Sequence, residues 1–275
     1  MWAKILLATF FLAMIASAVY FDPVRERAVL GTKSAEGPRL RLITWNIGYA
    51  SLEEDSRAHT KDLPAIAETI LRNDPDAVAL QELADPAQLE ALLGQLRRRY
   101  KGAVCSFGSN DRIEAVLVKD PDARFEEIRS GDRYAMSASF HFRKEAQEVV
   151  LVSAHADAFN AARRRVFTSD VVDSARARSS RAIVFIAGDF NFEVNARNQS
   201  NLFTDNVKND SESYSYILKY FRDLGRDAGW TALNERRIDY IFGPPEVALL
   251  RRAEVIRGAA VRHMDHWPLL IEVAF

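Results

Sequence analysis

Five short polar motifs stand in order along the 275-residue chain, and most of them close an apolar run. They are Thr44-Trp45-Asn46, Leu80-Gln81-Glu82, His155, Gly188-Asp189-Phe190-Asn191 and Asp265-His266, and a sixth, Arg237-Ile238-Asp239-Tyr240-Ile241, precedes the last of them. Because short apolar runs are typical of buried strands, the motifs place acidic, amide and imidazole groups at strand ends. With no cysteine cluster present, this pattern indicates an oxygen-ligand metal site with two histidines, which suits the cleavage of phosphate esters.

The first residues differ in character from the rest of the chain. A single lysine precedes the apolar stretch Ile5 to Ile15, and Ala16-Ser17-Ala18 supplies the small residues of a cleavage site. We predict a signal peptide at 1–18 and export to the periplasm or the extracellular space; the alternative is an uncleaved membrane anchor that reaches Phe21. Residues 19–38 would form a linker. No Pro/Gly/Ser-rich boundary divides residues 39–275, so we predict one domain there.

Charge and cysteine content limit the function only weakly. The net charge of −1 does not indicate a nucleic-acid binder by bulk electrostatics. It does not exclude one either, because carboxylates at a metal site mask basic patches in the sum. Cys105 is the single cysteine, so no intrachain disulfide can form. We interpret it as a buried, small apolar position and not as a nucleophile, since no cationic neighbour in the sequence would lower its pKa.

Hydrophobic periodicity predicts alternating strands and helices from Arg39 onward. We expect helices at about 63–71, 89–96 and 160–178, and a long polar surface loop at 193–215. Strands are expected at 40–46, 77–80, 103–107, 113–119, 135–142, 149–154, 182–187, 237–242, 253–257 and 268–275. Helices beside mixed, largely antiparallel strands predict a layered α/β sandwich.

In this order the motifs resemble those of the endonuclease/exonuclease/phosphatase superfamily, and within it the deoxyribonuclease I-like proteins. The resemblance covers about Arg39 to Phe275, and the complete set of motifs is far more specific than Gly188-Asp189-Phe190-Asn191 alone. It implies a four-layer α/β sandwich in which two packed sheets are flanked by helices. The stretch from Gly108 to Glu114 is also similar to the segment that supplies the carboxylate partner of a catalytic histidine.

The resemblance also implies a metal site. Mg²⁺ is the expected ion, with Mn²⁺ or Ca²⁺ as alternatives, because hard cations take oxygen ligands. Glu82 is the first expected ligand, assisted by the amide oxygen of Asn46. Asp265 and Asp189 are expected to contribute to the same or to a second metal position.

Each histidine is expected to act with a carboxylate that fixes its tautomer. By resemblance, His266 would accept a proton from the attacking water and would be oriented by Asp239. His155 would protonate or otherwise stabilise the leaving oxygen, with Glu114 behind it. Asn191 would hydrogen-bond a phosphoryl oxygen and keep the scissile group in line.

The substrate is less constrained than the chemistry. Leu83-Ala84-Asp85-Pro86 stands where deoxyribonuclease I has an arginine shortly after its metal-binding glutamate, and Arg112 replaces a minor-groove tyrosine. Arg112 and Arg133 are expected to contact phosphate. A nucleic-acid substrate is favoured, with lipid or inositol phosphates as the alternative and a non-enzymatic scaffold as a second one. No protein partner is implied, and a monomer is expected.

Ordinary structural interpretations exist for several of these positions. Asn46 and Asp189 could serve turns, Asp265-His266 could be a turn into the last strand, and Glu114 could face solvent. Arg163-Arg164-Arg165 would be a solvated helix face. The remaining positions with such an interpretation match no motif and are expected to be surface, structural or packing residues: His59, His141, His263, Trp230 and Trp267.

Overall fold

Two six-stranded sheets form the centre of the protein. The first has the order β11 (Leu249–Val255), β12 (Leu269–Ala274), β1 (Arg39–Asn46), β2 (Ala77–Leu83), β4 (Ile113–Val118) and β3 (Lys101–Val104). The second has the order β5 (Arg124–Ser130), β6 (Arg133–His141), β7 (Glu148–His155), β8 (Ile183–Asp189), β10 (Asp239–Gly243) and β9 (Arg222–Asp223). The pairs β1–β2 and β7–β8 are parallel, and the other neighbours are antiparallel. The predicted mixed, largely antiparallel sheets are therefore confirmed.

The structure is a computed structural model that describes residues 38–48, 58–108, 112–142, 148–195, 197, 206–246, 249–259 and 264–274. The predicted signal peptide at 1–18, the alternative anchor and the linker up to Gly37 lie outside these described residues. Within the described ranges, no helix is both long and apolar enough to cross a membrane.

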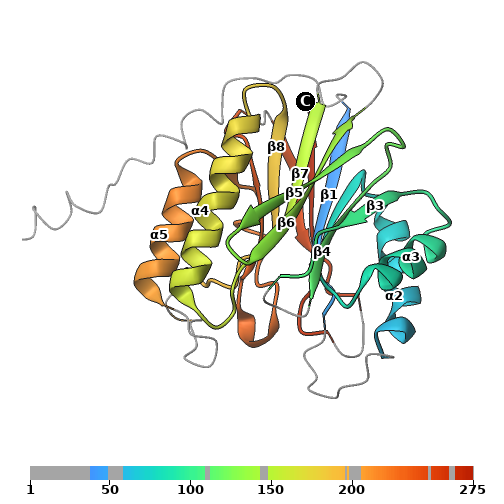
Figure 1. Ribbon diagram of the computed structural model, residues 1–275, viewed down its shortest axis with the longest axis horizontal. Helices are drawn as coiled ribbons and strands as arrows, with labels where there is room; N and C mark the ends of the chain where they lie inside the picture. Colours follow the sequence, from blue (N-terminus) through green and yellow to red (C-terminus); the bar gives the residue numbers. More distant parts are fainter. Residues whose placement is uncertain are drawn as a thin grey trace, which may run out of the picture. The chain divides into compact units, whose positions relative to one another are not determined.

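Helices cover the outer faces of the two sheets (Figure 1). The helices α2 (Ala58–Asn73) and α3 (Pro86–Gln95) lie beside the first sheet, and α4 (Ala161–Arg178) and α5 (Val207–Leu218) lie beside the second. A short 3₁₀ helix, η3 (Leu233–Glu235), precedes β10. The result is the expected four-layer α/β sandwich.

Burial follows from this layering. Every residue of β4 and β12 is buried, because these central strands have helix or strand neighbours on both faces. The edge strands β5 and β11 consist mostly of exposed or partly exposed residues. On α2, the residues Leu63, Ile66 and Ile70 recur at helical spacing and lie in the core against the first sheet.

The loop predicted at 193–215 is wrong in its second half, where α5 forms over Val207–Leu218. The Asn206 side chain accepts a hydrogen bond from the Asn209 N–H and caps this helix. Ile217 is buried against the second sheet, although most residues around it are polar. The polar composition of the segment concealed its helical periodicity.

The prediction of a solvated arginine face on α4 is wrong for Arg164, which has no exposed surface. Its Nε and one terminal nitrogen donate to Asp210 Oδ1 on α5 at 3.0 and 2.8 Å. Its other terminal nitrogen donates to the Asp157 carbonyl at 2.7 Å. A buried charge needs such partners, and the sequence places Asp210 46 positions away.

The strands β5 and β9 were not predicted.

Candidate active site

The topology gathers the polar motifs at one end of the sandwich. Each sheet contains one parallel pair joined through a helix, β1–α2–β2 and β7–α4–β8. Parallel strands end at the same edge, and ligand sites of α/β proteins lie outside these carboxyl ends. The side chains delivered there are Asn46, Glu82, His155 and Asp189. The antiparallel neighbours of these strands begin at the same edge, and they contribute Glu114, Arg133 and Asp239.

Asp189 lies between the two histidines. It is paired in register with His155 on β7 and with Asp239 on β10. Its Oδ2 lies 3.8 Å from His155 Nε2 and 3.7 Å from His266 Nε2. Gly188, which precedes it in β8, has a φ of +149°, and a Cβ there would lie 1.9 Å from the Ala154 carbonyl oxygen, so no other residue fits.

His266 and Asp239 form a direct contact. The His266 Nδ1 lies 2.8 Å from Asp239 Oδ2, and both side chains are buried. The Asp239 backbone N–H donates to the Thr231 hydroxyl at 3.0 Å and fixes the start of β10. Burial lowers the pKa of His266, but the carboxylates of Asp239 and Asp189 outweigh this and raise it well above its usual value.

His155 faces carboxylates on both ring nitrogens. Its Nδ1 lies 3.5 Å from Glu114 Oε1, and its Nε2 lies 3.6 Å from Glu82 Oε1. Burial lowers the pKa of His155, but the carboxylates of Glu114, Glu82 and Asp189 outweigh this effect and raise the pKa to about 9. The other Glu114 oxygen, Oε2, accepts from the Cys105 thiol at 2.9 Å. Cys105 is thus buried as predicted, and burial raises the pKa of its thiol, but it is also a hydrogen-bond donor.

Glu82 is held in a tight backbone niche. It has a positive φ of 61° beside an irregularity in the β2–β4 pairing. A Cβ on Gly48 would lie 2.0 Å from Glu82 Oε2. Only glycine at this position therefore lets the loop after β1 come so close to the Glu82 carboxylate. Asn46 Nδ2 donates to Glu82 Oε1 at 2.8 Å, and Asn46 Oδ1 accepts from the Gly48 N–H at 2.9 Å. The amide nitrogen therefore faces the carboxylates, where the sequence analysis placed the amide oxygen.

Asn191 and Asp265 complete the expected set. The Asn191 N–H donates to Asp189 Oδ1 at 2.8 Å, and its Nδ2 donates to the Ala156 carbonyl at 3.1 Å. Asp265 Oδ1 lies 3.8 Å from His266 Nε2. Burial raises the pKa of Asp265, and the nearby charges of Glu82 and Asp189 add to that rise. Both side chains border the same cleft as the histidines.

Two overlapping groups of side chains could hold a cation. Glu82, His155 and Asp189 form one group, and Asp189, Asp239 and His266 form the other; within each, the ligand atoms lie within 4.8 Å of one another. Of the four residues expected at the metal positions, Glu82 and Asp189 belong to these groups, Asp265 borders the cleft nearby, and Asn46 donates to both Glu82 and Asp189. Mutual repulsion of these clustered carboxylates is a cost that a divalent cation would relieve, so the donor set fits Mg²⁺ or a similar ion.

The catalytic cleft, as we name it, has a volume of about 860 Å³. Both predicted phosphate-binding arginines border it, but they differ in surroundings. Arg112 is partly exposed. Arg133 is buried; one terminal nitrogen lies 3.2 Å from Asp157 Oδ2, and the other donates to the His155 carbonyl at 3.2 Å. Arg133 therefore supports the backbone of His155 as well as facing the cleft.

Sequence reasoning missed several residues that border the cleft, among them Asp157, Phe159 and Arg236. Arg236 is buried and directly precedes the motif Arg237 to Ile241, so its position next to a predicted site motif was an available signal. Asp157 follows His155 by two residues, and its role depends on contacts with distant arginines. Nothing in the sequence distinguishes the exposed Phe159 from a core phenylalanine.

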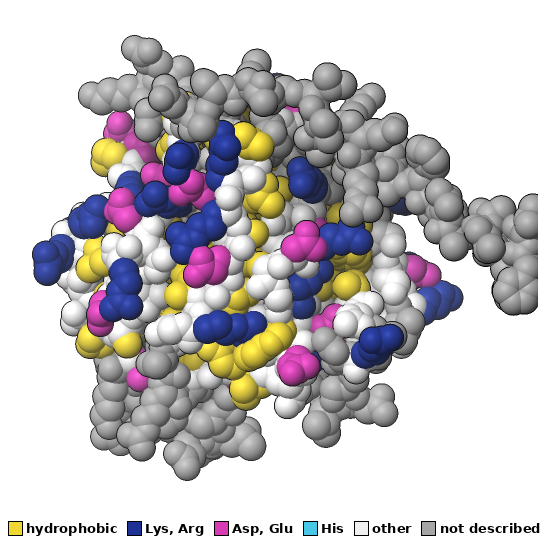
Figure 2. All heavy atoms as spheres, turned by 180° about the vertical axis from the view of Figure 1, so that it is seen from behind, with side chains coloured by type: hydrophobic (Ala, Val, Ile, Leu, Met, Phe, Trp, Pro, Cys, Tyr) yellow, Lys and Arg dark blue, Asp and Glu magenta, His cyan; other side chains and the backbone are white. Residues whose placement is uncertain are grey.

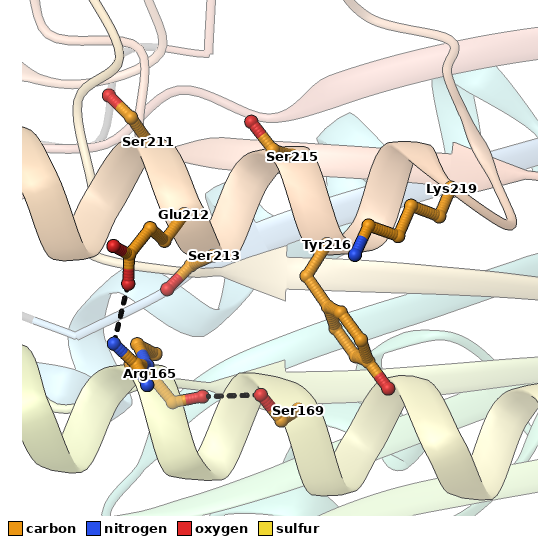
Figure 3. A pocket seen from close by; sticks show the side chains of 8 residues that line it. All are labelled: Arg165, Ser169, Ser211, Glu212, Ser213, Ser215, Tyr216 and Lys219. Carbon is orange, nitrogen blue, oxygen red and sulfur yellow. Dashed lines mark hydrogen bonds and ion pairs between the residues drawn. The ribbon is translucent and has the colours of Figure 1, made fainter.

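A second hollow lies between α4 and α5 (Figure 3). In Figure 3, Arg165 on α4 points to Glu212 on α5, and the Arg165 nitrogen lies 2.5 Å from the Glu212 carboxylate. The ring of Tyr216 and several serine hydroxyls line the remainder. None of these side chains belongs to the cluster at the strand ends, so the hollow is separate from the candidate active site.

Two histidines backed by carboxylates, set beside further acidic groups at the strand ends of a four-layer sandwich, define a metal-dependent hydrolase of phosphoric esters. The chain belongs to the Endonuclease/Exonuclease/phosphatase family, whose sequence model matches residues 43–267. This confirms the family resemblance inferred from the motifs. A search of curated proteins found no match.

Solved structures share the fold at low sequence identity. An endonuclease/exonuclease/phosphatase from Bacteroides vulgatus is 17% identical, with a TM-score of 0.67 over 86% of this chain and 99% of that one. The human nocturnin catalytic domain with bound sulfate anion is 18% identical, with a TM-score of 0.65 over 87% of this chain and 96% of that one. TDP2 from Caenorhabditis elegans is 19% identical, with a TM-score of 0.62 over 96% of this chain and 84% of that one.

Proposed function

We propose that this protein is a divalent-metal-dependent phosphodiesterase that hydrolyses nucleic-acid phosphodiester bonds. The observation that carries the proposal is the position of Asp189 between two histidines, each of which has its own carboxylate partner. Hydrolysis by in-line attack needs a base for the water and an acid for the leaving oxygen on opposite sides of the phosphorus. His266 with Asp239 and His155 with Glu114 supply such a pair.

In the proposed mechanism, His266 accepts the proton of the attacking water, and Asp239 holds its imidazole in the required tautomer. His155 donates a proton to the leaving oxygen, and Asn191 hydrogen-bonds a phosphoryl oxygen. The Asp189 carboxylate is positioned by the N–H groups of Asn46 and Asn191. When bound, a divalent cation would neutralise charge on the phosphoryl oxygens and offset that of Asp189, which would favour the neutral, proton-accepting form of His266. Glu82, Asp189 and Asp265 would hold that ion.

Cationic side chains in the cleft support a polyanionic substrate. Arg112, Arg133 and Arg236 all border it, and guanidinium groups match phosphate geometry. We propose that Arg112 contacts the phosphate backbone and that Arg133 acts chiefly by holding His155. Figure 2 shows Lys and Arg side chains scattered among Asp and Glu on the face seen from behind, so attraction there is not concentrated in one basic patch. The structure of the human nocturnin catalytic domain, which has a similar fold, contains a bound sulfate anion, and sulfate resembles phosphate in shape and charge.

The proposal is tested with a substrate panel and the full-length chain. Supercoiled plasmid, single-stranded DNA, RNA, sphingomyelin and phosphoinositides are each incubated with Mg²⁺, Mn²⁺ or chelator. We expect cleavage of at least one nucleic acid with a divalent cation and none in chelator. Turnover of a lipid or inositol phosphate, with no cleavage of DNA or RNA under either metal, would overturn the nucleic-acid assignment and retain the hydrolase chemistry.

We also propose that the protein acts after export, as the segment at 1–18 suggests. The support is the sequence pattern alone. N-terminal sequencing of the mature protein tests it, since cleavage after Ala18 leaves Val19 as the first residue. An intact Met1 on the exported protein would favour the anchor instead.

A further inference from the structure

Two large apolar side chains stand exposed on the border of the catalytic cleft. Phe159, four residues after His155, is 74% exposed, and Leu233 in η3 is 48% exposed. A single exposed apolar residue needs no explanation. Here two such residues, from segments far apart in the sequence, border the same cleft as the histidines and Asp189. An apolar border beside a polar catalytic floor is typical of a site that also binds the group attached to the reacting atoms.

The backbone that carries Phe159 is firmly held. The buried Asp157 accepts the N–H groups of both Phe159 and Asn160 on its Oδ1, each at 2.9 Å. The Oδ2 of Asp157 is paired with Arg133 at 3.2 Å, and its carbonyl accepts from the fully buried Arg164. The backbone position of Phe159 is therefore fixed before any ligand binds, so only the side-chain torsions remain to be ordered when a ligand covers the ring.

We propose that Phe159 is a stacking platform for a nucleobase adjacent to the scissile phosphate, with Leu233 contributing apolar contact. This subsite rests on the proposed nuclease function and specifies how the substrate is bound. Stacking of a base on an aromatic side chain contributes about five- to hundredfold in affinity. It tolerates any base, because every base has an aromatic face, so the subsite would bind single-stranded or unpaired segments without strong sequence preference.

The surroundings favour a nucleobase over a membrane as the occupant. The loop at 156–160 is short, and its backbone is bonded to Asp157, so it does not project as a hairpin. The neighbours of Phe159 in this loop, Ala158 and Asn160, are small or polar, whereas an inserting element would present several large apolar residues. Phe159 also borders the cleft together with Arg112 and Arg163, which suits a ligand with an aromatic base and a phosphate.

The test compares two esters with one leaving group, namely thymidine 5′-(p-nitrophenyl phosphate) and methyl p-nitrophenyl phosphate. For Phe159→Ala we expect KM for the thymidine ester to rise about five- to hundredfold with little change in kcat. The methyl ester, which has no base, should change at most about twofold. The Phe159→Trp variant should keep the KM of the unmodified protein for the thymidine ester. Phe107→Ala is the matched control, because Phe107 is also an exposed phenylalanine, at 53%, and does not border the cleft.

Binding of an eight-residue oligothymidylate, followed by fluorescence anisotropy in a His266→Ala background with Mg²⁺, separates the subsite from turnover. We expect Phe159→Ala to weaken it about five- to hundredfold. The subsite is overturned if the His266→Ala protein does not bind the oligothymidylate, or if Phe159→Ala leaves this binding unchanged. It is also overturned if Phe159→Ala raises KM equally for both esters. Phe159-dependent binding with neither ester hydrolysed would overturn the proposed function and support the subsite. Loss of binding to sphingomyelin–phosphatidylcholine vesicles with oligonucleotide binding unchanged would identify a membrane contact and overturn the proposal.

Discussion

Asn46 donates a hydrogen bond from Nδ2 to Asp189 Oδ2 over 3.0 Å, and this bond joins the two sheets at the candidate active site. Asn46 ends β1 in the first sheet, and Asp189 ends β8 in the second. Beneath it, Gln81 Nε2 on β2 donates to the Ser153 hydroxyl on β7 at 2.9 Å. The distances within the site are therefore set by how the sheets pack, and each buried polar group in this bridge has its partner in the other sheet.

Loss of this bond should affect activity and stability together. Asn46→Ala removes the donor that positions both Glu82 and Asp189. We expect kcat on bis(p-nitrophenyl) phosphate to fall about ten- to a hundredfold, as is usual when a metal-ligating carboxylate loses its hydrogen-bond partner. The free energy of unfolding should fall by about 1–3 kcal/mol, because the buried Oδ2 of Asp189 loses its hydrogen-bond donor.

Asn73→Ala is the matched control for this change. The Asn73 side-chain amide also donates a hydrogen bond, to the Thr69 backbone carbonyl at 2.8 Å, but it lies at the end of α2 and away from the site. Its kcat should equal that of the unmodified protein. Equal kcat for Asn46→Ala and Asn73→Ala would show that the bond between the sheets does not position the site.

Metal removal should abolish turnover. Chelator should stop hydrolysis, and Mg²⁺ or Mn²⁺ should restore it, because the clustered oxygen donors fit a hard cation. Glu82→Ala should raise the metal concentration that gives half-maximal rate about ten- to a hundredfold, with the melting temperature nearly unchanged. Glu90→Ala, which removes an exposed carboxylate paired with Arg98, should leave that concentration as it was. Undiminished activity in excess chelator would contradict the metal site.

Stability of the metal-free protein should depend on His155 at alkaline pH. The pKa of His155 is raised to about 9 in the folded chain, against about 6.5 when unfolded. The folded state thus holds this proton more tightly, so its contribution is fully present below about pH 6.5 and is lost as pH rises through about 9. In chelator, the melting temperature should fall by several degrees over that range.

His155→Gln isolates this effect from the other groups that titrate at high pH. The variant should show a shallower fall of melting temperature between pH 6.5 and 9.5 than the unmodified chain. The difference between the two curves is the contribution of His155. Parallel curves would show that the carboxylates of Glu114, Glu82 and Asp189 do not hold a proton on this ring.

The fold class and most site positions could be predicted because their signals are local. An apolar run that ends in a polar residue marks a strand end, and this pattern located Asn46, Glu82, His155 and Asp189. The helix α5 was missed because its residues are mostly polar and its buried face is narrow. Its stability depends on Asp210, which is paired with Arg164 of another helix, and a pair 46 residues apart leaves no periodic signal.

Orientation within the site depends on contacts between strands that are distant in the sequence. The amide nitrogen of Asn46 faces the carboxylates because Glu82 and Asp189 converge on it from different sheets, while the amide oxygen accepts a hydrogen bond from the Gly48 N–H. The sequence could name Asn46 as a site residue but could not show which end of the amide faces inward. The same holds for Arg133, whose guanidinium is shared between Asp157 and the carbonyl of His155.

Cys105 should influence catalysis through Glu114. Its thiol donates to Glu114 Oε2 at 2.9 Å, while Glu114 Oε1 faces His155 Nδ1. Cys105→Val removes this donor and leaves the backbone bond from Cys105 N to the Glu114 carbonyl in place. We expect kcat to fall about tenfold and the alkaline arm of the pH–rate profile to shift, because a less restrained carboxylate orients His155 less well.

Cys105→Ser supplies the comparison, since a hydroxyl also donates to a carboxylate. It should keep kcat within about threefold of the unmodified protein and leave the pH–rate profile in place, even where its melting temperature falls as far as that of Cys105→Val. Rescue by serine at equal stability distinguishes a positioning role from simple packing in β3–β4. A Cys105→Val variant with unchanged kcat and pH–rate profile would show that Glu114 needs no donor from this side chain.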